Sequence, residues 1–244
     1  ETGGDLRRRP NIFDSPLADQ FHILAYDQRG LGRTDRPDEP YTMIDYADDA
    51  HGLLHAMGWK SCSVMGVSFG GMVAQELALR HGHPIKRLVL ACTSCGGAGG
   101  ISYPLHELQG LPLREKAVRL TPLIDTRCDE AWQKAHPEAF ETMVDQMVAA
   151  MKIGADEPGR DLGARRQLEA RRGHDTEKRL SRLRMPVLIC GGRYDGISPT
   201  RNLRALQQRI PRAHLDVFDG GHRFLLQDSR AFERIIEFLK DDPA

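Results

Sequence analysis

The sequence has no surplus of charge of either sign, because 34 lysines and arginines balance 34 aspartates and glutamates. Without a basic surplus, nothing draws the chain to the phosphate backbone of DNA or RNA, so we expect no nucleic-acid partner. The sequence also lacks an apolar run near the roughly 18 residues that a membrane-spanning helix needs. We therefore expect a soluble protein with no membrane partner.

Cysteine is scarce, with five residues in 244. An odd number of cysteines, several of them in hydrophobic runs, is typical of reduced thiols that pack as small apolar side chains, so we expect a cytoplasmic protein. No group of histidines, cysteines and acids has the spacing of a metal site, and Cys92 and Cys95 have no second cysteine pair beside them. We therefore expect no metal and no cofactor.

Hydrophobic periodicity predicts an α/β fold. Short β-rich apolar runs, typical of buried strands, cover residues 21–26, 62–67, 87–92, 186–190 and 214–218. Segments of helical period cover residues 43–57, 72–81, 200–210 and 229–240. Strands that alternate with helices predict a mostly parallel sheet with helices on both faces.

The alternation of strands and helices stops at residues 101–183, which contain no convincing strand. Helices are expected to begin near Pro112, Asp129, Pro137 and Pro158, since proline and acids suit a first helical turn, and a short helix is expected at 175–183. We predict a core of residues 1–100 and 184–244, with 101–183 as a helical cap (lid) over the carboxyl edge of the sheet, where open α/β sheets bind ligands. The alternative is a separate helical domain.

A Gly-x-Ser-x-Gly motif joins the strand predicted at 62–67 to the helix after it; the motif reads Gly66-Val67-Ser68-Phe69-Gly70. A serine at such a strand-turn-helix junction projects its hydroxyl from a strained backbone, and glycines let the strand and the helix approach closely. Ser68 is therefore the candidate nucleophile.

A serine hydroxyl needs a histidine base and a carboxylate that orients it. Asp195 follows the strand predicted at 186–190, and His222 follows the strand predicted at 214–218. Both lie at carboxyl ends of strands, as Ser68 does, so the three residues are expected to meet at one edge. Asp219 and Asp216 fit less well as the acid, because they do not lie in a loop before the histidine's strand.

These motifs together resemble the α/β-hydrolase superfamily; they cover residues 26–34, 66–75, 193–199 and 220–222. Residues 68–75 and 193–197 are most similar to capped esterases and lactonases of the 3-oxoadipate enol-lactonase type. Cofactor-free haloperoxidases, meta-cleavage C–C hydrolases and proline iminopeptidases share the same core. The resemblance implies Ser68 as nucleophile, His222 as base, Asp195 as acid and the Phe69 amide as an oxyanion donor. Relatives with aspartate at the elbow, the haloalkane dehalogenases and epoxide hydrolases, are disfavoured.

The start of the sequence departs from the family pattern, in which strands and a His-Gly loop precede this point. By resemblance, a further strand lies between the strands predicted at 21–26 and 62–67, so we expect that roughly 20 to 30 residues precede Glu1. The second oxyanion amide is then expected at Thr2, or at Gly3.

Two groups in the cap allow both a functional and a structural interpretation. Trp132, Phe140 and Met147 recur at helical spacing and are our candidates for substrate binding, although ordinary cap core explains them equally well. A basic stretch could meet a substrate carboxylate, although a solvated helix face is the simpler interpretation; it comprises Arg165, Arg166, Arg171 and Arg172.

The sequence thus predicts an enzyme, a serine hydrolase that cleaves a small carboxylic ester or lactone through an acyl-enzyme intermediate. The alternatives are a C–C bond hydrolase or a cofactor-free perhydrolase (haloperoxidase) on the same triad, and a small-molecule receptor with vestigial hydrolysis. A second copy of this chain, forming a homodimer, is a further candidate partner.

Overall fold

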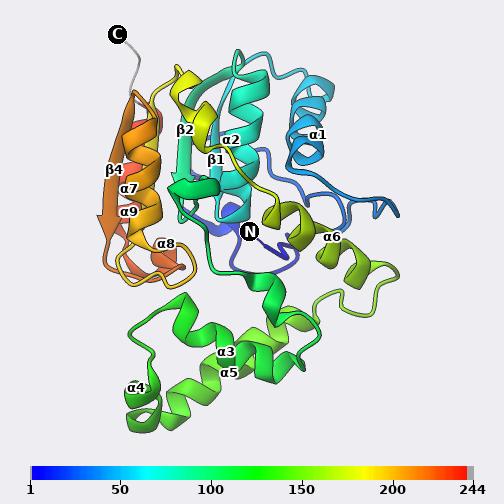
Figure 1. Cartoon of the computed structure of the whole chain (residues 1–244), viewed down its shortest axis with the longest axis vertical. Coiled ribbons are helices and arrows are strands. Elements are labelled where there is room, and N and C mark those ends of the chain that lie inside the picture. The colour runs from blue at the N-terminus through cyan, green and yellow to red at the C-terminus, as the bar shows by residue number, and fades with distance from the viewer. Residues whose placement is uncertain (1, 241–244) are drawn as a thin grey trace.

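The structure is a computed structural model that describes residues 2–240 (Figure 1). Its centre is a parallel sheet in which four strands follow one another in chain order. The strands are β1 (Cys62–Val67), β2 (Ile85–Ala91), β3 (Val187–Gly192) and β4 (Ala213–Phe218). The predicted strands 62–67, 87–92, 186–190 and 214–218 are thereby confirmed, with shifts of one or two residues at their ends.

Successive side chains of each strand point to opposite faces of the sheet, so the core has two layers. In β2, Leu88 and Leu90 face a cluster with helices α1 (Met43–Ala56), α2 (Phe69–His81) and α7 (Thr200–Arg209). Val89 and Ala91 face the opposite cluster, which includes α8 (Phe224–Gln227) and α9 (Arg230–Lys240). Because both of its faces are buried, the part of β2 at residues 88–91 is apolar throughout. The predicted α/β fold with helices on both faces is confirmed.

The prediction of a strand at residues 21–26 is wrong. The segment forms no ladder with any strand among residues 2–240 and is a loop that ends at Gln28. Its apolar pattern has another cause: Phe21 and Ile23 pack in the α9 layer, whereas Tyr26 packs in the α2 layer. Burial that alternates along this segment therefore gives the sequence pattern of a β-strand, although no neighbouring strand exchanges hydrogen bonds with the segment.

Residues 101–183, hereafter the helical insertion, connect β2 to β3 through helices. These are α3 (Leu113–Ile124), α4 (Glu130–Ala135), α5 (Pro137–Lys152) and α6 (Arg160–Arg172). They begin close to the predicted positions: Pro112 and Asp129 are N-caps, Pro137 opens α5, and α6 starts two residues after Pro158. The helix expected at 175–183 is a 3-10 helix, Glu177–Arg182; further 3-10 turns cover Ile12–Asp14, Gly97–Gly99 and Leu105–Leu108.

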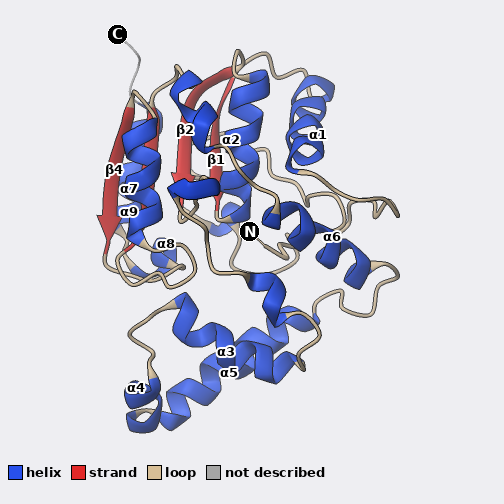
Figure 2. Cartoon of the chain, in the orientation of Figure 1, coloured by secondary structure: helices blue, strands red, loops and turns tan. Residues whose placement is uncertain are grey.

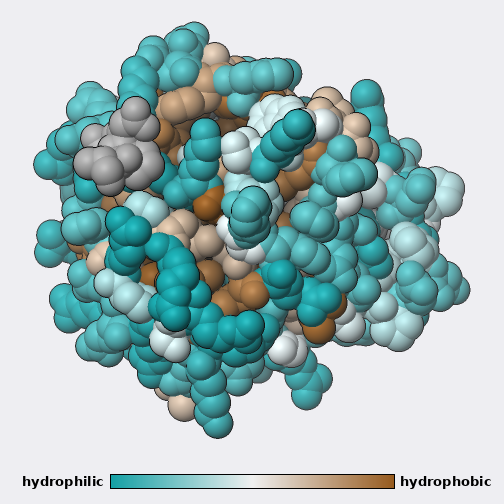
Figure 3. All heavy atoms as spheres, turned by 90° about the horizontal axis from the view of Figure 1, so that it is seen from above, coloured by the Kyte–Doolittle hydropathy of each residue, from teal (hydrophilic) through white to brown (hydrophobic). Residues whose placement is uncertain are grey.

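Part of the insertion lies beyond the carboxyl ends of the strands. Figure 2 shows the strand arrows pointing toward the end of the molecule where α3 and α5 lie, with α6 at the side of the molecule, below α1 in this view. On the face seen in Figure 3, apolar atoms are broken up by hydrophilic side chains. Among residues 2–240, no helix combines the length and the apolar character that crossing a membrane requires.

Candidate active site

Ser68 occupies the sharp turn between β1 and α2. Its backbone has φ 56° and ψ −117°, a positive φ that side-chain-bearing residues rarely adopt, so the predicted strain is confirmed. A Cβ added to Gly66 would lie 2.4 Å from the Gly70 carbonyl oxygen, and one added to Gly71 would lie 2.6 Å from the Cβ of Thr93. Only glycine permits such close packing around the turn.

Ser68, His222 and Asp195 form one hydrogen-bonded chain. The Nε2 of His222 lies 2.9 Å from the Ser68 Oγ, and its Nδ1 lies 2.8 Å from the Asp195 Oδ2. The other carboxylate oxygen of Asp195 accepts hydrogen bonds from the amides of Ile197 and Ser198, each at 2.8 Å. Since the carboxylate is fixed by these amides, it holds the imidazole in one orientation.

The strand ends explain why these residues meet. Ser68 follows β1, Asp195 lies in the loop after β3, and His222 lies in the loop after β4. Asp219, the alternative acid, instead donates its amide to Asp228 and pairs with Arg127. The arrangement predicted from the order of the motifs is thus the one that the structure contains.

Sequence reasoning missed a fourth residue at this edge, Cys92. It directly follows β2, has φ 40°, and is buried. Its sulfur, an Asp195 oxygen and a His222 nitrogen all lie within 4.8 Å of one another. The available signal was its position at the end of a predicted strand, but a cysteine there was interpreted only as core.

The chain of hydrogen bonds can activate the serine. With Nδ1–H donating to Asp195, the Nε2 of His222 carries the lone pair that accepts the Ser68 proton. This tautomer is assigned from the hydrogen-bond network. A carboxylate at Nδ1 also stabilises the imidazolium that forms when the proton moves.

The candidate oxyanion donors are the backbone amides of Phe69 and Thr2. Phe69 opens α2, so its amide belongs to the first turn, where N–H groups lack helical partners and the helix dipole favours negative charge. The amide of Gly3 donates to the Gln167 Oε1 at 2.7 Å and is therefore engaged. The Oγ1 of Thr2 is buried without a hydrogen-bond partner.

The end of α3 contacts the loops that carry Asp195 and His222. The Ile124 carbonyl accepts the His222 amide at 2.6 Å, and the Leu123 carbonyl accepts the Gly196 amide at 2.9 Å. The amide of Thr126 donates to the Tyr194 carbonyl at 2.9 Å. The insertion is thus attached to both loops through backbone groups.

The candidate substrate-binding residues lie within the insertion. Phe140 and Met147 pack in the apolar cluster between α3 and α5, and the Trp132 ring stacks on His136 at 4.8 Å. Two cavities, of about 290 and 410 Å³, are both lined by residues outside the Ser68, Asp195 and His222 chain. The contacts favour the structural interpretation for Phe140 and Met147, which belong to the core of the insertion, whereas Trp132 lies outside that cluster.

The basic stretch of α6 is not one solvated face. Arg165 and Arg172 are exposed, but Arg171 is only 7% exposed, and burial lowers its pKa to about 10. The Nε of Arg171 has no hydrogen-bond partner, and no carboxylate in the described part of the chain pairs with the guanidinium. The expectation of a solvated face is therefore wrong for Arg171, because the helix turns this position toward the protein interior.

Known proteins resemble this chain over most of its length. The poly(3-hydroxyalkanoate) depolymerase of Ectopseudomonas oleovorans is 27% identical over 94% of this chain and 79% of its own. The 2-hydroxymuconate semialdehyde hydrolase of Pseudomonas putida is 31% identical over 91% and 78%. The crystal structure of the enol-lactonase from Burkholderia xenovorans superposes with a TM-score of 0.77, at 24% identity, over 99% of this chain and 89% of that one.

The family comparison agrees with the geometry. A model of the alpha/beta hydrolase fold matches residues 3–229, which include the turn at Ser68, the loops of Asp195 and His222, and the insertion. The two sequence relatives are named as a depolymerase and a hydrolase, and the solved structure shares the fold. The chain belongs to the α/β hydrolase family.

Proposed function

We propose that this protein is a serine hydrolase that cleaves a small carboxylic ester or lactone. The observation that carries the proposal is the hydrogen-bonded chain of Ser68, His222 and Asp195, with 2.9 and 2.8 Å between the interacting atoms. A nucleophile, a base and an orienting acid at these distances are what acyl transfer requires.

In the first step, Ser68 Oγ attacks the substrate carbonyl while the Nε2 of His222 takes the hydroxyl proton. The carbonyl oxygen becomes an oxyanion, which the Phe69 amide and the Thr2 amide receive. The imidazolium then gives its proton to the leaving alkoxide, which leaves an acyl-enzyme on Ser68. Asp195 keeps the ring in place and stabilises its charge throughout.

In the second step, His222 takes a proton from a water molecule, which attacks the acyl carbon. The tetrahedral intermediate collapses, Ser68 regains its proton from His222, and the free acid leaves. The insertion acts as a cap that excludes bulk water, since α3 is bonded to the loops of both Asp195 and His222.

Arg171 supports a narrower substrate class, an ester or lactone that also bears a carboxylate. A buried guanidinium without a counter-charge is costly, and an anionic group of the substrate would remove this cost. Its neighbour in α6, Ala170, belongs to the apolar cluster that buries Phe69. Adjacent residues of a helix point in different directions, so this contact places α6, and not the Arg171 guanidinium itself, beside the turn at Ser68.

A second candidate uses the same triad on a carbon–carbon bond. It is favoured by the relative named 2-hydroxymuconate semialdehyde hydrolase, at 31% identity. Comparing hydrolysis of p-nitrophenyl esters with that of a vinylogous diketone acid separates the two functions.

The proposal is tested with p-nitrophenyl acetate. We expect a burst of p-nitrophenol equal to the enzyme concentration, followed by steady turnover, since an acyl-enzyme forms and is hydrolysed. Ser68→Ala should abolish both phases, and Ser229→Ala, at an exposed position, should change neither. A residual rate above about one tenth of wild type in Ser68→Ala would exclude the assignment, because losing a triad member costs several orders of magnitude. A burst without turnover would indicate a receptor.

A further inference from the structure

Cys92 directly follows β2, the strand that lies between β1 and β3 in the sheet. Its amide donates to the Cys190 carbonyl of β3 at 2.8 Å, while the Ser68 amide donates to the Ala91 carbonyl of β2 at 2.8 Å. The φ of Cys92, 40°, is a left-handed value that side-chain-bearing residues rarely adopt, and the residue is 1% exposed. The backbone therefore holds Cys92 at the same edge of the sheet as Ser68.

The side chain of Cys92 lies close to those of Asp195 and His222. Its sulfur, an Asp195 oxygen and a His222 nitrogen all lie within 4.8 Å of one another. Ligand atoms around a tetrahedral zinc ion lie about 3.3 to 3.8 Å apart, because the bonds to the ion are about 2.0 to 2.3 Å long. Movements of about 1 Å or less therefore bring the three atoms to the spacing of a zinc site.

The three groups together suit a divalent cation. A thiolate, a carboxylate and an imidazole are side-chain ligands that zinc takes in proteins. The thiolate and the carboxylate contribute two negative charges and the neutral imidazole none, so their complex with Zn²⁺ has no net charge. Neutrality matters because Cys92 and Asp195 are buried, where an uncompensated charge is costly.

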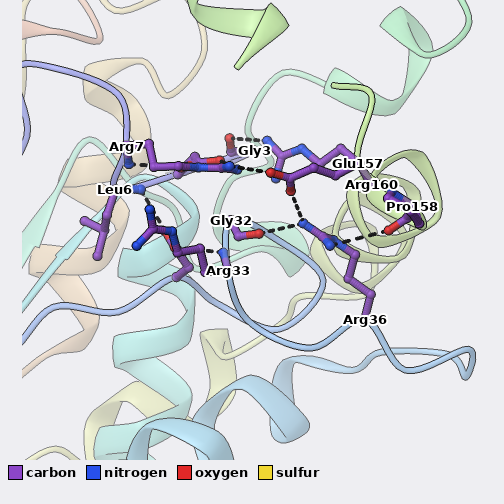
Figure 4. A network of polar contacts seen from close by, with 11 residues as sticks. Gly3, Leu6, Arg7, Gly32, Arg33, Arg36, Glu157, Pro158 and Arg160 are labelled. Carbon is purple, nitrogen blue, oxygen red and sulfur yellow. Dashed lines mark hydrogen bonds and ion pairs between the residues drawn. The ribbon is translucent and has the colours of Figure 1, made fainter. Parts of the chain in front are cut away.

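Acids in another polar cluster of the structure are held by arginines instead. Figure 4 shows Glu157 paired with both Arg7 and Arg36, and Asp5 likewise pairs with Arg7. A guanidinium at such a carboxylate repels an approaching cation. Asp195 pairs with a histidine, whose neutral ring offers a lone pair and no repulsion. The cluster at Cys92 is therefore able to accept a cation, unlike the arginine network.

An ion at this position takes His222 out of the proposed mechanism. The Nδ1 of the ring bonds to Asp195 and its Nε2 lies next to Ser68, so whichever nitrogen binds the ion loses its own partner. If Nδ1 binds, Asp195 no longer orients the ring; if Nε2 binds, no lone pair remains for the Ser68 proton. The thiol proton of Cys92, together with the Nδ1 proton in the first case, passes to water.

We propose that Cys92, Asp195 and His222 form an inhibitory site for a thiophilic divalent cation such as Zn²⁺. The ion enters from the side of His222, whose side chain is 13% exposed, whereas that of Asp195 is fully buried. Its effect on the rate rests on the proposed hydrolase function, but its binding rests on the position of the three side chains alone. The ion takes no part in ester hydrolysis.

The first test measures hydrolysis of p-nitrophenyl acetate at increasing Zn²⁺ concentrations, with each rate divided by the rate of the same variant without metal. We expect Zn²⁺ to inhibit and EDTA to restore the rate, while Mg²⁺, which prefers oxygen ligands, has no effect. Losing an outer contact of a metal site lowers affinity about 10- to 100-fold, so Cys92→Ala should raise the half-inhibitory Zn²⁺ concentration at least about 100-fold. Cys62→Ala, which removes a half-buried thiol at the start of β1, should leave it unchanged.

A second test detects the bond to sulfur without using activity. Cd²⁺ bound to a thiolate gives an ultraviolet charge-transfer band, and Cys62→Ala serves as the background because the other cysteines are buried. Stoichiometric Cd²⁺ should give the band in Cys62→Ala, and adding Cys92→Ala should remove it. Adding Ser68→Ala instead should preserve the band, since the serine is not a ligand. If Cys92→Ala does not fold, Cys92→Ser replaces it, because a hydroxyl keeps its proton and binds these ions weakly.

The outcomes separate this proposal from the hydrolase function. Equal inhibition of Cys92→Ala and wild type overturns the site, as does the lack of a Cd²⁺ band in Cys62→Ala. A band that depends on Cys92, without inhibition by Zn²⁺, overturns the inhibitory role. A band that depends on Cys92, with full activity in Ser68→Ala, keeps the metal site and removes the hydrolase function.

Discussion

The Oγ1 of Thr93 donates a hydrogen bond to the Ser68 carbonyl at 2.8 Å, across 25 residues of sequence. The carbonyl of Thr93 in turn accepts the Ser198 hydroxyl at 2.8 Å. The turn after β2 therefore joins the strained backbone at Ser68 to the loop that carries Asp195. Both contacts are buried, so they are stronger constraints than exposed ones.

Thr93→Val removes the first of these bonds and keeps the side-chain shape. We expect kcat to fall about 3- to 10-fold and the free energy of unfolding to fall by about 1 kcal/mol, as is typical for one lost hydrogen bond. Ester hydrolysis and urea unfolding measure the two effects. The matched control is Thr142→Val in α5, whose hydroxyl bonds the Glu138 carbonyl. Equal kcat in both variants would show that Thr93 does not position Ser68.

Asp195→Asn should reduce kcat by about 10³- to 10⁴-fold, because an amide cannot fix the same imidazole tautomer or stabilise imidazolium. Asp219→Asn should leave kcat within about twofold of wild type, since Asp219 does not contact His222. Steady-state rates on p-nitrophenyl acetate test both. The reverse ranking would move the acid to Asp219.

Arg171→Met should raise KM about 10- to 100-fold for an ester that bears a free carboxylate and should leave a neutral ester almost unaffected, since a charged hydrogen bond is lost only with the former. Arg172→Met, at an exposed position, is the control. The same Arg171→Met substitution should raise the thermal midpoint, because it removes an unpaired buried charge. Equal effects on the two esters would show that Arg171 does not bind a substrate carboxylate.

We expect the free energy of unfolding to fall in mild acid because of the buried imidazole of His174. Burial lowers the pKa of its imidazole from 6.5 to about 4, and its Nε2 lies 3.2 Å from the Ser94 carbonyl oxygen. Between these pH values the unfolded chain binds a proton that the folded chain does not, so stability present above pH 6.5 is lost as pH falls toward 4.

The expected contribution of His174 is about 2 kcal/mol between pH 7.5 and pH 5. Urea unfolding at both pH values should therefore show a smaller pH effect in His174→Gln than in wild type. His214→Gln, at an exposed position in β4, should behave as wild type does. If His174→Gln keeps the full pH dependence, another group is responsible.

The features that could be predicted from the sequence are those that depend on residues close together in the chain. Apolar runs located four strands, and the glycines around Ser68 indicated the turn, because strand burial and backbone strain act on neighbouring residues. The order of strand ends then placed Asp195 and His222 beside Ser68 without knowledge of any distance.

Contacts between residues far apart in the chain could not be predicted, because local patterns do not encode them. Gly3 and Gln167 are 164 residues apart, and no local periodicity indicates that they meet. The segment at 21–26 shows the converse, since its alternation reflects burial in two layers and not pairing. Arg171 was grouped with exposed neighbours because composition does not show which way a helix turns each side chain.

The way α3 meets the core has a consequence for engineering. The bonds from Leu123 and Ile124 to the loops of Asp195 and His222 use backbone carbonyls, which every amino acid supplies. The apolar side chains of α3 and α5 meanwhile pack mainly on one another. The same span also bonds the core through side chains, since Asp125 accepts the Gln227 amide at 2.8 Å and Arg127 lies 4.4 Å over the Tyr194 ring. We therefore expect a graft of this span from a relative to keep the loops of Asp195 and His222 in register only if it retains these two side chains.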